Sequence, residues 1–246
     1  MSAKTMRSAL PIDPEHALVP RRDAPLHIAD GTLEALKWAA LALMLLDHVN
    51  TFLFYRTLPG AYAVGRWVAP VFGFVLACNL ARPDALQRGI HLRVMRRLAV
   101  FGLLASPPFM ALIGRWWPLN IMFLLLAATA VIYGLERADG IGVAIAGFAF
   151  FVGGLSAEYL HPGVAMVVAA WAFCRQPNVL HFAAWTLFTA ALVLINGNFW
   201  ALSAVPTLLL ATRLDLRVPR LRWAFYALYP LHLVVLWWIR DGHKLV

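Results

Sequence analysis

Long runs of apolar residues alternate with short polar connections along most of this chain, and each run ends at a charged residue or at a cluster of Pro, Gly or Asn. A helix that crosses a membrane needs roughly 20 mostly apolar residues, and a helix enclosed by other helices can be shorter. The pattern therefore predicts an all-α, polytopic membrane protein with about nine transmembrane helices. The predicted helices are Leu36–Phe54, Val64–Leu80, Leu98–Ile113, Leu119–Leu135, Ile141–Leu155, Val164–Cys174, Leu180–Ile195, Phe199–Thr212 and Trp223–Ile239.

The amino-terminal segment differs from the rest of the chain. It contains several prolines and mixed charges but no long apolar run, so it does not resemble a secretory signal peptide. We predict a disordered cytoplasmic tail over residues 1–32 and a single transmembrane domain over 33–246. The sixth predicted helix is short enough to be a half-span, and losing it would reverse the predicted side of everything that follows.

The distribution of Lys and Arg predicts the orientation, because cytoplasmic loops carry the excess of positive charge. With the amino terminus in the cytoplasm, the opposite face receives only Arg56, Arg66, Arg115, Arg240 and Lys244. The cytoplasmic face receives Lys4, Arg7, Arg21, Arg22, Arg82, Arg88, Arg93, Arg96, Arg97, Arg137, Arg175, Arg213, Arg217, Arg220 and Arg222. This asymmetry favours an odd number of spans and places the carboxyl terminus outside the cytoplasm.

Composition narrows the class further. The chain is 62% hydrophobic and 13% charged, and its net charge of +9 comes from short clusters between apolar segments, which indicates membrane topology and not nucleic-acid binding. Cys78 and Cys174 both lie in apolar segments without a partner at metal-ligand spacing. Neither a disulfide framework nor a metal site is therefore indicated, and both thiols are expected to be small buried side chains.

Ionisable residues inside predicted spans are costly, so they are candidates for function. Asp47 and His48 lie about 17 Å into a hydrocarbon core of about 30 Å. His48 is suited to proton transfer near neutral pH. Adjacent helix positions do not face each other, so Asp47 is expected to serve another partner, and Arg66 across the following hairpin is the candidate. That pair is either architectural or a source of oxyanion stabilisation.

Polar residues in two later segments extend the set of candidates. Glu158 lies at the outer end of the fifth predicted span, where a solvated loop is the alternative interpretation. In the last predicted helix Tyr226, Tyr229 and His232 recur every three residues and therefore share one face, where they either line a site or are satisfied within the core. Asn120 adds a hydrogen-bonding group on the outer side.

A basic stretch after the second span contains Arg93, Arg96 and Arg97. Its simplest role is topological. Positive charge at a cytoplasmic mouth also suits a phosphorylated donor, and Arg93 and Arg97 share one face if the third helix starts early.

Six motifs together resemble the TraX family of membrane proteins, named for the acetylase of conjugative pilin. The run LKWAALALMLLDHVN is similar to the opening L-K-x-I-A and M-x-x-D-H signature, and RWVAPVFGF, MRRLAVFGLLASPPF, WPLNIMF, EYLHPGV and RWAFYALYPLHL follow in the family's order from about Leu33 to Leu236. Asn50 stands where the family has glycine, and Glu158 where it usually has aspartate.

The resemblance implies transfer of an acetyl group from acetyl-CoA to an acceptor at the bacterial inner membrane, with the amino terminus of a pilin-like protein as the type substrate. It also implies kinship with membrane acyltransferases that carry an essential histidine in the first helix. The matching positions are Asp47, His48, Arg66, Asn120, Glu158, Tyr229 and His232.

These observations lead to a mechanistic hypothesis in which the phosphates of acetyl-CoA bind Arg93, Arg96 and Arg97, and His48 acts as general base or accepts the acetyl group itself. His232, Asn120 or Arg66 would stabilise the oxyanion. Three alternatives remain: an O-acetyltransferase that acts on a glycan or lipid hydroxyl, a proton-coupled transporter with Asp47, His48 and His232 as a relay, and a structural scaffold.

Overall fold

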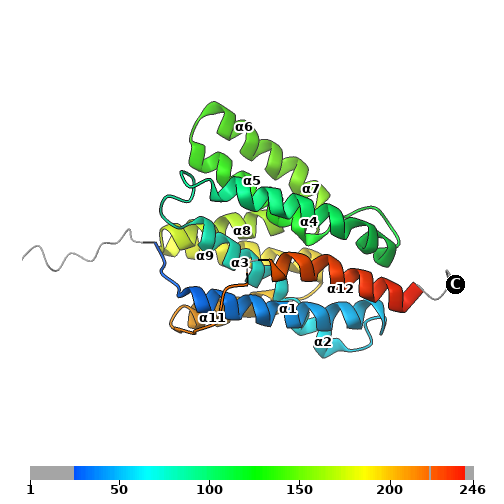
Figure 1. Ribbon diagram of the computed structural model, residues 1–246. Coiled ribbons are helices and arrows are strands. Elements are labelled where there is room, and N and C mark those ends of the chain that lie inside the picture. Colours follow the sequence, from blue (N-terminus) through cyan, green and yellow to red (C-terminus); the bar gives the residue numbers. More distant parts are fainter. Residues whose placement is uncertain (1–24, 222, 242–246) are drawn as a thin grey trace, which may run out of the picture.

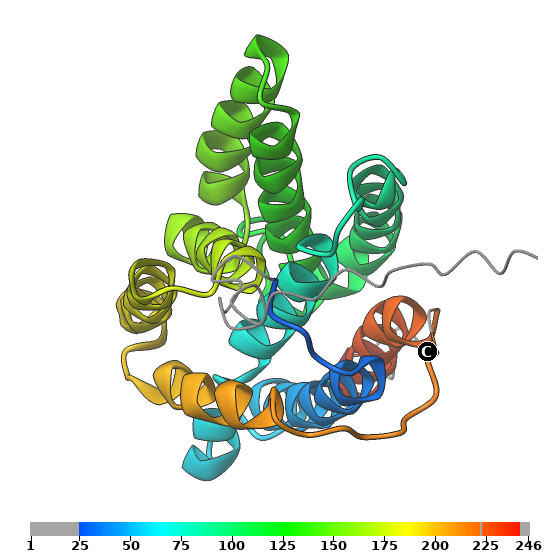
Figure 2. The ribbon, with the colours of Figure 1, turned by 90° about the vertical axis from the view of Figure 1, so that its left-hand side faces the viewer.

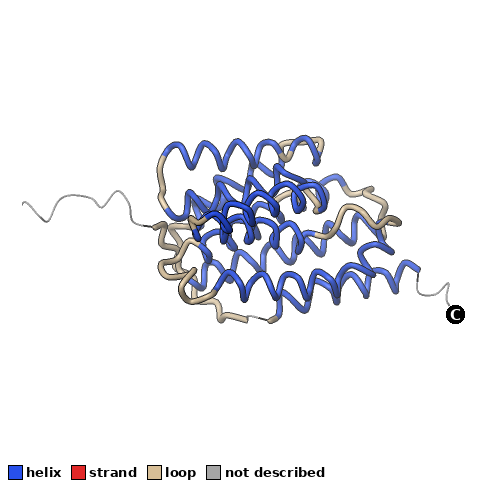
Figure 3. The backbone as a smooth tube through the Cα atoms, turned by 90° about the horizontal axis from the view of Figure 1, so that it is seen from above, coloured by secondary structure: helices blue, strands red, loops and turns tan. Residues whose placement is uncertain are grey.

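The computed structural model describes residues 25–221 and 223–241, and helices make up most of this part of the chain. The helices run roughly along one common direction and their connections gather at the two ends of the bundle (Figures 1 and 3). Each predicted span corresponds to one helical segment of the described residues. Three of these segments are long and apolar enough to cross a membrane, namely Pro59–Leu80, Ile90–Ile113 and Val179–Asn196.

Most segments are single helices and a few are broken in the middle. The single ones are α1 (Asp30–Phe52), α4 (Ile90–Ile113), α5 (Ile121–Arg137), α8 (Leu160–Arg175) and α12 (Ala224–Asp241). The broken ones are α2 (Pro59–Gly65) with α3 (Val68–Leu80), α6 (Gly140–Phe148) with the π-helical η2 (Ala149–Gly153) and α7 (Gly154–Ser156), α9 (Val179–Ala191) with α10 (Val193–Asn196), and η3 (Trp200–Ser203) with α11 (Ala204–Ala211).

Several helix starts follow from local sequence. The side chains of Asn120, Asp139 and Asn178 each accept a backbone N–H in the first turn of α5, α6 and α9, respectively. Such caps satisfy donors that a helix leaves without partners. The helix α4 begins at Ile90, eight residues before the predicted start, and therefore includes the basic stretch.

The core lies between α3, α8 and α9, where aromatic rings stack. The Trp185 ring is fully buried, with the Phe74 ring 5.0 Å and the Phe173 ring 5.6 Å away, centroid to centroid. In the end-on view α5 and α6 form a hairpin that projects from the rest of the bundle (Figure 2). Gly134 on α5 and Gly142 on α6 allow this hairpin to pack closely, because a Cβ on Gly134 would lie 2.3 Å from the Gly142 carbonyl oxygen.

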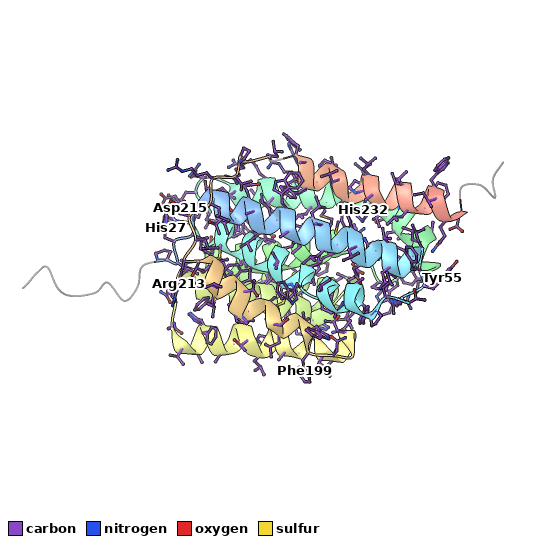
Figure 4. All side chains as sticks on the ribbon, turned by 90° about the horizontal axis from the view of Figure 1, so that it is seen from below. His27, Tyr55, Phe199, Arg213, Asp215 and His232 are labelled. Atoms are coloured by element: carbon purple, nitrogen blue, oxygen red, sulfur yellow. A yellow bond between two sulfur atoms is a disulfide. The ribbon has the colours of Figure 1, made fainter. Side chains whose placement is uncertain are left out.

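The two ends of the bundle separate the charges as the sequence predicts. The basic end is the one that carries the connections 25–29, 81–89, 138–139, 176–178 and 212–221, and the far end carries the connections 53–58, 114–120, 157–159 and 197–199. Figure 4 labels His27, Arg213 and Asp215 at the basic end and Tyr55 at the other, with His232 between them. At the far end the Arg240 guanidinium donates to the carbonyl oxygens of Ala111 and Leu112 and so ties α12 to α4.

One expectation from the sequence is wrong. Cys78 and Cys174 form a disulfide between α3 and α8, which pack together although the cysteines are 96 residues apart. Of the segment expected to be a tail, residues 25–32 are described: α1 begins at Asp30, Ile28 is buried, and the Leu26 N–H donates to the Cys174 carbonyl oxygen. Residues 1–24 of that expected tail lie outside the described residues, as do Arg222 and Lys244 of the charge count.

Candidate functional site

Asp47 and Arg66 form an ion pair between α1 and the end of α2. Arg66 Nη2 lies 2.5 Å from Asp47 Oδ2, and both side chains are about one-eighth exposed. The pairing predicted from the sequence is therefore confirmed. Gly65 makes this approach possible, since a Cβ at that position would lie 2.5 Å from Asp47 Cγ. A pair this deeply enclosed stabilises only when both partners are present.

Further contacts hold the Arg66 guanidinium in place. Its Nε donates to the Tyr62 carbonyl oxygen, its Nη1 donates to Asn196 Oδ1 at 3.3 Å, and it lies over the Tyr62 ring. Asp47 Oδ1 and Asn196 Nδ2 are buried without a hydrogen-bond partner among the described residues. The network thus joins α1, α2 and α10. Within it the acceptor Asp47 Oδ1 and the donor Asn196 Nδ2 remain without a partner among the described residues.

Asn50 holds the connection after α1. Its Nδ2 donates to the Leu58 carbonyl oxygen and its Oδ1 accepts from the Leu58 N–H, and the side chain is fully buried. This two-way contact shapes residues 53–58 and so fixes where α2 begins. Asn50 is a structural residue that the sequence analysis did not identify as one.

His48 and His232 lie side by side, from α1 and α12. His48 Nδ1 is 2.7 Å from His232 Nε2, and the two rings are nearly parallel. On the other side of the pair, His232 Nδ1 is 2.9 Å from the Leu228 carbonyl oxygen, one turn earlier in α12. The sequence marked both histidines as candidates but assigned them separate roles; the structure brings them into direct contact.

Tyr229 and Glu158 meet at the start of α5. Tyr229 is 3% exposed, its hydroxyl has no hydrogen-bond partner of good geometry among the described residues, and its ring is 5.4 Å from that of His232. Glu158 lies in the connection between α7 and α8, where enclosure by protein raises its pKa to about 7, against the opposing influence of Arg66.

Asn120 has a different position from the one its predicted role requires. Its Oδ1 accepts the Met122 N–H, and its Nδ2 donates to the Gly102 carbonyl oxygen and to Ser106 Oγ. Both ends of the amide are therefore occupied, which makes Asn120 the residue that anchors the start of α5 to α4. The oxyanion role that the sequence suggested for its amide has no free donor to support it.

A cavity of about 320 Å³ opens beside the basic end. Arg93 and Arg97 line it from one face of α4, as expected for a helix that starts early. Arg96 is exposed and does not line it, so the structure brings Arg93 and Arg97, but not Arg96, to this cavity. The structure adds further cations to the lining, namely Lys37, Arg82, Arg88 and Arg220.

The cations of this basic-end cavity differ in whether they have partners. Glu34 contacts Lys37 and Arg220, and Asp30 contacts Arg82. Within the described ranges Arg88, Arg93 and Arg97 have no acidic partner within ion-pair distance, although Arg97 lies over the Trp223 ring. Three guanidinium groups at one cavity are thus available to an anion.

The cavity leads from these cations toward the histidines. Met44, Ile121 and Tyr229 line it. Met44 is four residues before His48 and Tyr229 three residues before His232, so each histidine follows about one helical turn farther along a similar face. Asp47, His48, Arg66, Glu158, Tyr229 and His232 are called the polar cluster below.

The fold and the site define a helical protein of membrane type, with a buried polar cluster beyond a cation-lined cavity. The model of the TraX protein family matches residues 32–240, so the chain belongs to the TraX family. Protein TraX of Escherichia coli is 30% identical over 110 residues, which cover 45% of this chain and 42% of that relative. The match therefore spans less than half of the relative's length. No solved structure matches this chain.

Proposed function

We propose that this protein is a polytopic membrane acetyltransferase that moves an acetyl group from cytoplasmic acetyl-CoA to an acceptor at the membrane. The family membership and the order of the motifs make the amino terminus of a pilin-like protein the first acceptor to test. A glycan or lipid hydroxyl is the alternative acceptor. The observation that carries the proposal is one cavity lined both by Arg88, Arg93 and Arg97, which have no acidic partner among the described residues, and by Tyr229 of the polar cluster.

The donor fits the cavity by charge and by polarity. Arg88, Arg93 and Arg97 would hold the phosphates, because guanidinium groups bind phosphate oxygens with paired, charge-assisted hydrogen bonds. The apolar walls from α1, α3 and α4 would enclose the arm that carries the thioester. The thioester supplies an activated acetyl group, and its carbonyl would lie near Met44 and Tyr229, at the end of the cavity closest to the histidines.

Transfer then needs a base and an oxyanion donor. His48 would take the proton from the acceptor amine as nitrogen attacks the thioester carbon, and would return it to the leaving thiolate. The Tyr229 hydroxyl has no partner in the described part of the chain and would donate to the oxyanion. Arg66 remains bound to Asp47 and Asn196. It would therefore stabilise the oxyanion through its positive charge and not through a direct hydrogen bond.

The decisive test combines binding with transfer. Purified protein in nanodiscs is incubated with labelled acetyl-CoA and either a pilin-derived peptide with a free amino terminus or the same peptide blocked at that end. We expect label only on the free peptide, and loss of at least about 100-fold in rate for His48→Ala. Undiminished transfer by that variant would sink the proposed base, and label on an added glycan would favour the alternative acceptor.

Matched arginine variants test the donor site independently of the acceptor. CoA should raise the unfolding temperature of the wild-type protein, since a ligand selective for the folded state stabilises it. Arg93→Gln and Arg97→Gln should weaken CoA binding by roughly 10- to 100-fold, the value of one charge-assisted hydrogen bond. Arg96→Gln, on the same helix but outside the cavity, is the control. Equal weakening by all three variants would indicate a general charge effect and contradict the assigned site.

A further inference from the structure

The chain of contacts through His48 and His232 determines which ring nitrogens carry protons. A carbonyl oxygen only accepts hydrogen bonds, so the 2.9 Å contact with Leu228 requires a proton on His232 Nδ1. A neutral imidazole has a single N–H, and therefore His232 Nε2 carries a lone pair.

The tautomer of His48 follows from that of His232. Because His232 Nε2 is an acceptor, the 2.7 Å contact requires that His48 Nδ1 donates. Neutral His48 then carries its lone pair on Nε2. This nitrogen has no hydrogen-bond partner among the described residues, and it is not fully enclosed by protein. The reactive lone pair is thus on the one nitrogen of the pair that is still accessible.

Among the described residues, His232 is the one that forms a hydrogen bond with the His48 ring. The Asp47 carboxylate, next to His48 in sequence, is bound to Arg66. The Phe52 ring lies 5.5 Å from the His48 ring. Tyr229 contacts the far ring, that of His232. In the described part of the chain no carboxylate contacts His48, in contrast to the usual pairing of a catalytic histidine with an acidic residue.

The contact between His232 and the carbonyl lies within α12. Leu228 is four residues before His232, so its carbonyl oxygen lies on the same helix face as the His232 side chain, one turn away. The orientation of the second histidine is built into α12 and does not depend on a third helix.

We propose that His232 is a positioning residue that holds His48 in the Nδ1-protonated tautomer and makes His48 Nε2 the base. When Nε2 takes a proton from the acceptor, the Nδ1 proton of His48 moves to His232 Nε2, so His48 is again neutral and the positive charge lies on His232. The reverse transfer restores both rings when the leaving thiolate is protonated. This role rests on the proposed function of His48 and replaces the oxyanion role suggested for His232 by the sequence.

The tautomer can be measured without enzymatic activity. Protein labelled with ¹⁵N-histidine is placed in nanodiscs, and the His48 signals are assigned by difference from His48→Gln. The nitrogen chemical shifts distinguish protonated from bare imidazole nitrogens, and we expect a protonated Nδ1 and a bare Nε2. The opposite assignment in the wild-type protein overturns the proposal even if acetyl transfer is intact. The expected tautomer in a protein without acetyl transfer would instead mean that the proposed function has failed.

Two substitutions at one position separate orientation from proton sharing. His232→Gln provides a side-chain carbonyl that accepts from His48 Nδ1–H but takes no proton, whereas His232→Ala provides neither. We expect His232→Gln to keep the His48 tautomer and part of kcat. His232→Ala should lose the tautomer and lower kcat by on the order of 10²- to 10⁴-fold with KM for the donor unchanged, as for a base left in the wrong tautomer.

A histidine outside the site serves as the control. The His181 ring forms hydrogen bonds with Asn178 and Gln176 at the basic end and contacts no residue of the polar cluster among the described residues, so His181→Gln should change neither the His48 signals nor kcat. An unchanged His48 tautomer in His232→Ala would overturn the positioning role, because some other group would then be orienting His48.

Discussion

Arginine has opposite surroundings in the two halves of the molecule. In the polar cluster, Arg66 is enclosed and bound by Asp47, Asn196 and the Tyr62 carbonyl oxygen. In the basic-end cavity, Arg88 and Arg93 are exposed and have no acidic partner in the described ranges. A charge within a membrane-type interior must be neutralised by the protein itself, whereas a charge near the surface can remain hydrated until a ligand arrives. The charges of the polar cluster are therefore held in fixed positions, and those of the basic-end cavity are available to bind a ligand.

The largest expected effect comes from breaking the enclosed pair. Asp47→Asn leaves Arg66 buried without a counter-ion and should lower the free energy of unfolding by about 3–5 kcal/mol. Chemical unfolding in detergent micelles measures this loss. The double variant Asp47→Asn/Arg66→Gln should recover part of it, because no unpaired charge remains. If Asp47→Asn is as stable as the wild type, Arg66 does not depend on Asp47 for neutralisation of its charge.

The second effect is the pH dependence of Glu158, whose pKa is raised to about 7 from an ordinary 4.5. A raised carboxyl pKa means that the folded state binds the proton more tightly than the unfolded state. Stability is therefore full below pH 4.5 and falls as pH rises to 7, by about 3 kcal/mol at most.

The variant Glu158→Gln removes this ionisation. Its unfolding free energy should match the wild type near pH 4.5 and exceed it above pH 7, as measured by unfolding at a series of pH values. A constant difference across that range would mean that Glu158 does not titrate with a raised pKa.

The third effect tests the close approach of α1 and α2. Gly65→Ala places a methyl group against the Asp47 side chain and should destabilise by about 1–3 kcal/mol, the usual range for overpacking. Gly60→Ala is the matched control on the same helix, because a Cβ there meets no atom within 4 Å. Thermal unfolding of both variants measures the difference. Equal stabilities of Gly65→Ala and Gly60→Ala would contradict the tight contact between Gly65 and Asp47.

The smallest expected effect is a difference in salt dependence between the basic-end cavity and the polar cluster. Raising the salt concentration from 0.1 to 1 M shortens the screening length from about 10 to 3 Å, which weakens exposed charges far more than enclosed ones. CoA binding at the cavity, measured by calorimetry, should weaken roughly tenfold over this range. The stability loss caused by Asp47→Asn should change little. A stability loss that disappears in high salt would place the Asp47–Arg66 pair in contact with solvent.

Local properties of the sequence predict a large part of this picture. The nine helical segments follow from apolar runs and their polar interruptions, and the basic end follows from the distribution of Lys and Arg. The pairing of Asp47 with Arg66 follows from the short hairpin between them and from the cost of a lone buried charge. The shared face of Arg93 and Arg97 follows from the 3.6-residue period of a helix.

Only the tertiary structure reveals contacts between segments far apart in the chain. His48 and His232 are 184 residues apart, and nothing in either helix alone indicates that their rings meet. The Cys78–Cys174 disulfide, the exclusion of Arg96 from the cavity, and the contacts of the Asn120 amide nitrogen with α4 likewise depend on which helices pack together. The sequence by itself determined which side chains are costly to bury and on which helix face they lie. The packing order of the helices, which no local periodicity encodes, decided which of these side chains meet and which nitrogen of His48 is left to react.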